Sequence, residues 1–120
     1  DNTGVDMYLG TGGAPEGVLA AVALRCIGGQ IQGRLMPMKD EERERAEKMG
    51  IADIKRKFKL EDMASADVVF SATGVTDGSL LKGVRVRGDF AETETVVMRA
   101  KTGTVRRIRS TVRNVGARFI

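Results

Sequence analysis

The stretch that decides the fold is a glycine-rich loop, which reads Gly10-Thr11-Gly12-Gly13-Ala14-Pro15-Glu16-Gly17. The apolar run before it, residues 5–9, predicts a strand, and residues 18–24 after it predict a helix. The loop therefore joins the end of a strand to the N-terminus of a helix. Backbone N–H groups at a helix N-terminus lack partners and carry partial positive charge, so they suit an anion. Glycines let a ligand come close to that backbone.

A carboxylate lies in the same loop. Pro15 fits the first helical position, where its missing N–H costs nothing, and Glu16 follows it in the first turn. A phosphate site with a carboxylate beside it suggests metal-assisted phosphate chemistry. A second interpretation stays open from these residues, namely an ordinary strand-to-helix turn in which Glu16 complements the helix dipole.

The common phosphate-binding motifs do not match this loop. A dinucleotide-binding fingerprint, G-x-G-x-x-G, requires a third glycine at the position of Pro15. A P-loop requires a lysine after its last glycine, whereas Val18 follows Gly17. The loop therefore needs support from the rest of the chain.

The composition sets the class of protein. The 120 residues allow one domain with one core, and 42% are apolar while only 4% are aromatic. No apolar stretch approaches the length of a membrane span, and no signal-peptide pattern opens the chain. We therefore expect a cytoplasmic protein. Because the sequence begins at Asp1, almost on a predicted strand and without an initiator Met, we expect a fragment or a processed piece of a longer protein.

Cysteine and histidine usage exclude several kinds of site. The single Cys26 excludes an internal disulfide, fits a reducing compartment, and predicts a buried apolar role. The absence of histidine excludes Ser-His-Asp and Cys-His catalysis and any His-based metal site within the chain. Metals would need carboxylates here, which favours hard ions such as Mg²⁺ or Mn²⁺.

The rest of the chain alternates helices and strands. We predict helices over residues 15–26, 41–49 and 59–65, with Asp40 capping the second and Gly50 ending it. Strands are predicted over residues 30–35, 67–72 and 84–87, and a hairpin over residues 93–99 and 104–108 around Lys101-Thr102-Gly103. This order predicts an α/β fold: a layered α/β domain with a mixed sheet and an antiparallel β-hairpin near the C-terminus.

Two further segments carry polar groups whose role is open. Residues 73–78 follow a predicted strand as the first loop does, and such loops converge on the ligand in open α/β sheets. Asp77 and the Thr hydroxyls there either face a substrate or form a turn cornered at Asp77-Gly78. The polar face of the strand at residues 30–35 either lines a cleft or is simply half-exposed.

Basic residues gather at the C-terminal end of a chain whose net charge is +4. No acidic residue occurs from position 99 onward, and the basic ones are Arg99, Lys101, Arg106, Arg107, Arg109, Arg113 and Arg118. An alternative function is therefore a polyanion- or nucleic-acid-binding module. Phe119 is the single aromatic residue of this stretch, so base stacking is poorly served, and we do not expect a nucleic-acid partner. A third possibility is an assembly fragment without activity.

The glycine-rich loop and four further sequence blocks carry a family resemblance. The loop is accompanied by Thr3-Gly4-Val5-Asp6, Cys26-Ile27-Gly28-Gly29-Gln30-Ile31-Gln32-Gly33-Arg34-Leu35, Ala72-Thr73-Gly74-Val75-Thr76-Asp77-Gly78 and Val97-Met98-Arg99-Ala100-Lys101-Thr102-Gly103-Thr104. Together they resemble the C-terminal part of the class II (GlpX-type) fructose-1,6-bisphosphatases, over nearly the whole chain up to about Ile108.

The resemblance implies a fold, an activity and two site residues. It implies the stacked α/β layers of the metal-dependent sugar phosphatases and hydrolysis of the 1-phosphate of fructose 1,6-bisphosphate with Mn²⁺ or Mg²⁺. Some relatives also accept sedoheptulose 1,7-bisphosphate. It implies that Glu16 coordinates the metal and that Gly13 lies against the substrate.

The resemblance also implies what this chain does not hold. The remaining acidic metal ligands of the family lie upstream, so we expect the 120-residue chain to be inactive by itself. We expect residues 1–110 to form the C-terminal α/β domain of a sugar bisphosphatase and residues 111–120 a basic tail. The expected partners are the sugar bisphosphate and either further copies in a homo-oligomer or the missing N-terminal part, with no membrane.

Overall fold

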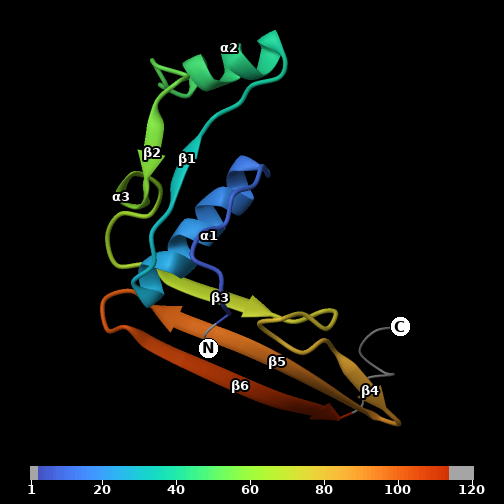
Figure 1. Ribbon diagram of the computed structural model, residues 1–120. Coiled ribbons are helices and arrows are strands. Elements are labelled where there is room, and N and C mark those ends of the chain that lie inside the picture. Colours follow the sequence, from blue (N-terminus) through green and yellow to red (C-terminus); the bar gives the residue numbers. More distant parts are fainter. Residues whose placement is uncertain (1–2, 114–120) are drawn as a thin grey trace.

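The computed structural model describes residues 3–113. Figure 1 shows two parts, a long antiparallel sheet and an arm that leads away from it, with one helix beside both. The elements in chain order are α1 (Ala14–Ile27), β1 (Gln32–Arg34), α2 (Asp40–Lys48), β2 (Lys57–Lys59), α3 (Leu60–Met63), β3 (Val69–Thr73), β4 (Arg85–Arg87), β5 (Phe90–Arg99) and β6 (Thr104–Arg113).

Strand β5 is the centre of the larger sheet. It pairs with β6 along its whole length, from Phe90 opposite Arg113 to Arg99 opposite Thr104. Its other side pairs first with β4 and then with β3. The α/β class and the C-terminal hairpin are confirmed. The pairs within residues 3–113 are antiparallel where a mixed sheet was expected, because short reverse connections join β4, β5 and β6, whereas a parallel pair needs a crossover.

Helix α1 covers one face of this sheet. Cys26 near its end packs with the buried side chains of Leu81, Val96 and Met98. The Cys26 thiol lies 3.8 Å from the carbonyl oxygen of Val68, so the predicted buried role of this free cysteine is confirmed. The predicted span of the helix was short by one residue at each end.

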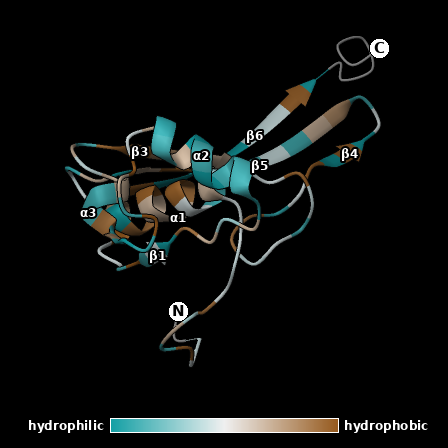
Figure 2. Cartoon of the chain, turned by 90° about the horizontal axis from the view of Figure 1, so that it is seen from above, coloured by the Kyte–Doolittle hydropathy of each residue, from teal (hydrophilic) through white to brown (hydrophobic). Residues whose placement is uncertain are grey.

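A second cluster joins α1 to the base of the arm. Ala21 of α1 is fully buried against Leu60 and Ala64, which lie in and after α3. Beyond this cluster the β1–β2 ribbon carries α2 at its far end (Figure 1). Figure 2 shows α2 as largely hydrophilic, which agrees with a helix whose only buried residue is Ala46.

The start of α2 corrects one prediction. Lys39, not Asp40, is the N-cap residue, and no side chain caps the helix there. Glu42 instead reaches back, and its Oε2 accepts a hydrogen bond from the Met38 N–H at 2.8 Å. Asp40 is thereby the first helical residue, where its charge still complements the dipole. Gly50 follows the helix with a φ of 87°, as a glycine after a helix end is expected to do.

The predicted strand over residues 5–9 is wrong. No strand pairs with this segment in the part of the chain that the structure describes, and its large apolar side chains are exposed, from 66% for Val5 to 87% for Tyr8. Alternating apolar side chains favour a strand, but a strand also needs a neighbour for its backbone hydrogen bonds.

The loop between β3 and β4 is folded tightly on the sheet. Gly74 donates its N–H to the Glu94 carbonyl at 3.0 Å, and Lys82 donates its N–H to Glu94 Oε2 at 2.6 Å. Asp77 Oδ1 accepts a hydrogen bond from the buried Gly83 N–H at 2.8 Å, which lowers the pKa of that carboxyl. Asp77 therefore shapes the loop, and the structure supports the turn interpretation.

This packing makes Gly83 sensitive to substitution. A Cβ there would lie 2.7 Å from the Thr76 carbonyl carbon and 2.8 Å from the Asp77 nitrogen, closer than real side chains approach backbone. We expect Gly83→Ala to lower the free energy of unfolding by about 1–3 kcal/mol through overpacking, measured by urea denaturation. Gly12→Ala is the control, because a Cβ at Gly12 meets open space. Equal unfolding midpoints for the two variants would contradict the packing argument.

Candidate functional site

The candidate site is the N-terminus of α1. Gly13 is the N-cap residue, with an extended backbone at φ −66° and ψ 148°, and its carbonyl accepts a hydrogen bond from the Gly17 N–H at 3.0 Å. Pro15 occupies the second helical position, one residue later than predicted, and contributes no N–H. The N–H groups of Ala14 and Glu16 have no acceptor among residues 3–113, so they remain available to an anion.

The Glu16 side chain folds back over Gly13. A Cβ on Gly13 would overlap the Glu16 Oε2 atom, so the carboxylate lies directly against the Gly13 Cα. Glu16 is exposed and forms no hydrogen bond or ion pair with any described residue. The structure thus brings together the two residues singled out by the sequence, while their roles stay predictions.

The chemistry of this arrangement fits part of a metal site. A free carboxylate is a ligand that Mg²⁺ and Mn²⁺ accept, and the neighbouring N–H groups suit a phosphate oxygen. Within residues 3–113, however, no group of three His, Cys, Asp or Glu side chains is arranged to hold a metal ion. Glu16 can therefore serve as one ligand, and further oxygen ligands must come from outside the described residues.

The loop after β3 does not join this site. The end of α1 that packs on the sheet is its C-terminal end, at Cys26, while Gly13 lies at the opposite end of the helix (Figure 1). The 14 residues of α1 correspond to about 20 Å at 1.5 Å per residue. The expected convergence of the two loops is therefore not observed. The β1 strand shows the alternating exposure of a half-exposed ribbon, which supports that interpretation of residues 30–35.

Several basic residues of the C-terminal stretch have structural contacts. Arg99 Nη2 lies 2.6 Å from Asp67 Oδ2, and Arg107 Nη1 donates a hydrogen bond to the Leu80 carbonyl at 2.9 Å. The Arg113 guanidinium lies 5.2 Å from the centre of the Phe90 ring. Strand β6 includes residues 111–113, while residues 114–120 of the predicted basic tail lie outside the described residues. These contacts engage three of the arginines that a polyanion-binding surface would use.

No helix within residues 3–113 has the length and apolar character that a membrane crossing requires.

Sequence comparison identifies the family. The family described as "Bacterial fructose-1,6-bisphosphatase, glpX-encoded" matches residues 1–112. The chain belongs to this family. It is 42% identical to the fructose-1,6-bisphosphatase class 2 of Haemophilus influenzae, over 88% of this chain and 36% of that protein. It is 41% identical to proteins named D-fructose 1,6-bisphosphatase class 2/sedoheptulose 1,7-bisphosphatase from two Synechococcus strains, over 34% of each.

The chain spans about a third of the length of these curated relatives. The resemblance carried by the glycine-rich loop and the four further blocks is confirmed. Gly13 and Glu16 lie within the matched residues, but the comparisons assign no role to either, and the remaining two thirds of the relatives' length is not represented here.

The Gly13–Glu16 contact gives a direct test of local geometry. Gly13→Ala places a Cβ where the Glu16 carboxylate lies, so the side chain must turn away. We expect a change in the ¹³C chemical shift of the Glu16 carboxyl carbon on Gly13→Ala and none on Gly12→Ala, where a Cβ meets open space. If both variants leave this shift unchanged, the carboxylate does not rest against Gly13 in solution.

The Asp67–Arg99 pair makes stability depend on pH. The hydrogen bond from Arg99 lowers the pKa of Asp67 below its ordinary value of 3.8, with help from the Lys101 N–H. Since the folded pKa is depressed, the stabilisation is complete above pH 3.8 and is lost as the pH falls through the folded value. We expect Asp67→Asn to lower the urea midpoint at neutral pH and to lose this effect in acid.

Asp89→Asn is the control for this measurement, because Asp89 forms no hydrogen bond or ion pair with any described residue. A wild-type to Asp67→Asn difference that stays constant down to strongly acid pH would show that the pair contributes nothing through its charge.

Proposed function

We propose that this chain forms part of a phosphoric monoester hydrolase that removes the 1-phosphate of fructose 1,6-bisphosphate. Membership of the family and the activities for which its relatives are named support this activity. The observation in the structure that carries the proposal is the unpartnered Glu16 carboxylate, placed against Gly13 at a helix N-terminus with free N–H groups.

Each group at the α1 N-terminus has a proposed role. Glu16 would serve as one ligand of a divalent cation, Mn²⁺ or Mg²⁺, and Gly13 would allow the substrate to approach the backbone. When bound, such an ion neutralises phosphate oxygens and lowers the pKa of a coordinated water. The free N–H groups of Ala14 and Glu16 orient the phosphate, since they offer donors whose hydrogen bonds strengthen on an anion.

The other ligands and most substrate contacts come from the part of the polypeptide that this chain does not represent. The exposed apolar side chains of residues 5–9 support a covering partner there, because a soluble protein rarely leaves such a run uncovered. We place the complete protein in the cytoplasm, in gluconeogenesis and sugar-phosphate metabolism, as a homo-oligomer or an assembly with the missing N-terminal part.

A chimera tests the role of Glu16. Residues 1–112 of this chain replace the matching segment of the Haemophilus influenzae relative, and phosphate release from fructose 1,6-bisphosphate is measured with Mn²⁺ or Mg²⁺. We expect turnover in the chimera and a loss of at least about a hundredfold on Glu16→Gln, because a ligand is lost from the cation. Sedoheptulose 1,7-bisphosphate is assayed in parallel, since the Synechococcus relatives are named for both activities.

Glu41→Gln is the matched control, because Glu41 is an exposed carboxylate in the first turn of another helix, α2. Full turnover by the Glu16→Gln chimera, with both variants folded, would overturn the assigned role. The 120-residue chain alone is expected to release no phosphate, and clear metal-dependent turnover by it would show that the ligands outside the chain are dispensable.

A further inference from the structure

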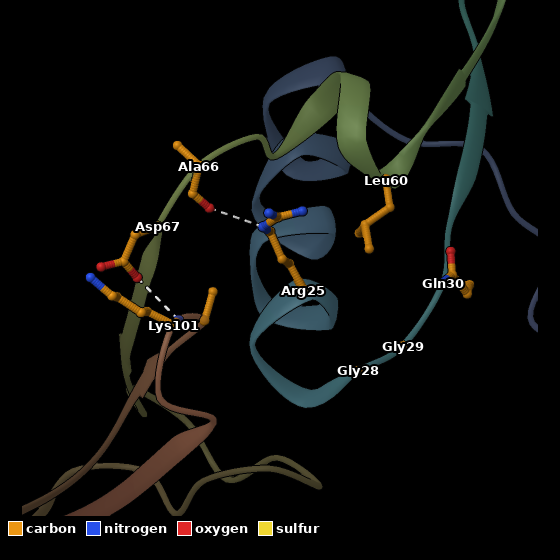
Figure 3. Close-up of a pocket in the computed structure, with 9 residues that line it drawn as sticks. Arg25, Gly28, Gly29, Gln30, Leu60, Ala66, Asp67 and Lys101 are labelled. Carbon is orange, nitrogen blue, oxygen red and sulfur yellow. Dashed lines mark hydrogen bonds between the residues drawn. The ribbon is translucent and has the colours of Figure 1, made fainter.

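A cavity of about 440 Å³ lies at the C-terminal end of α1, where the helix meets the base of the arm and the β5–β6 turn (Figure 3). The residues that line it include the charged Arg25, Asp67 and Lys101 and the small Gly28, Gly29 and Ala66. Ligand pockets typically measure about 300–1,000 Å³. The cavity is therefore large enough for a small organic molecule.

Arg25 is the fixed cation of this cavity. Its Nε donates a hydrogen bond to the Ala66 carbonyl at 3.0 Å, and its side chain is half-buried. Ala66 adopts a φ of 67°, a conformation that L side chains rarely adopt. The two terminal amino groups of Arg25 have no acceptor among the described residues. A guanidinium held at Nε with both amino groups free matches the two oxygens of a phosphate or carboxylate.

Lys101 supplies a second cation at the edge of the cavity, beside Asp67, and its flexible four-carbon stem allows the ammonium to turn toward Arg25. Figure 3 shows Arg25 between Leu60 on one side and Asp67 with Lys101 on the other. The Lys101 ammonium forms no ion pair with a described residue. Asp67 forms its ion pair with Arg99, whose Nη2 lies 2.6 Å from Asp67 Oδ2, and it interacts with the Lys101 charge only at longer range. Its Oδ1 accepts the Lys101 backbone N–H at 3.1 Å. The cavity thus has a surplus of positive charge.

The other walls suit an organic group. Leu60 is buried and lines the cavity together with Ala100, so the two residues offer apolar surface beside the cations. We propose that this cavity binds a small organic phosphate, with its phosphate held by Arg25 and Lys101 and its body against Leu60 and Ala100. Along the axis of α1, Arg25 is about 14 Å from Glu16 at 1.5 Å per residue, so this cavity is not part of the Gly13–Glu16 site.

Phenyl phosphate and inorganic phosphate are the probes. Each is titrated into the 120-residue chain at constant ionic strength, and binding is followed by calorimetry and by amide NMR shifts. We expect shifts at Gly29 and Lys101, and tighter binding of phenyl phosphate than of inorganic phosphate because its ring contacts Leu60. Arg25→Gln and Lys101→Gln should each weaken phenyl phosphate binding about tenfold or more, the effect of a lost charged hydrogen bond.

Arg43→Gln is the charge-matched control, since Arg43 lies on α2 at the end of the arm and outside the cavity. Equal weakening by Arg43→Gln would reduce the binding to general attraction by a basic protein and would overturn the proposal. So would equal affinities for the two probes, or shifts confined to other residues. If Arg25→Gln proves unfolded by circular dichroism, Lys101→Gln decides, because the exposed Lys101 side chain forms no hydrogen bond or ion pair with any described residue.

Discussion

The packing of the last turns of α1 on the sheet is the constraint on which the rest of the structure depends. Cys26 lies among Leu81, Val96 and Met98, and the sheet beneath it is assembled on β5. Because the C-terminal end of the helix is the one that packs on the sheet, its first turn, with Gly13 and Glu16, projects away from β3 (Figure 1). The position of the candidate site thus follows from a contact at the far end of the same helix.

Local sequence signals predicted the elements that depend on neighbours in the chain. The β5–β6 hairpin follows from two β-prone runs around a glycine turn, and α1 follows from its proline, its small apolar residues and Gly28. The strand expected over residues 5–9 failed because a strand requires a distant pairing partner, which no periodicity can supply. Asp40 failed as a cap because the helix begins one residue earlier, where the Lys39 carbonyl accepts the N–H groups of Glu42 and Arg43.

The two candidate sites differ in how much of their arrangement the sequence can predict. Gly13 and Glu16 are three residues apart, so helix geometry alone places the carboxylate over the glycine. Arg25, Asp67 and Lys101 come from three separate segments, and their proximity depends on α1 meeting both β3 and the hairpin turn. No spacing in the sequence connects these three residues. In the structure, the positive φ of Ala66, whose carbonyl binds Arg25, draws attention to this cavity.

The β5–β6 hairpin also has a consequence for the order of folding. Its ten registered pairs close on a turn of a few residues, so the loop-closure entropy lost in forming it is small. By contrast, the contacts of α1 with β3 and β5 join segments more than forty residues apart. They stabilise the fold only after a large loop has closed. We therefore expect the hairpin to form early and α1, with the site at its first turn, to pack on a sheet that has already begun to form.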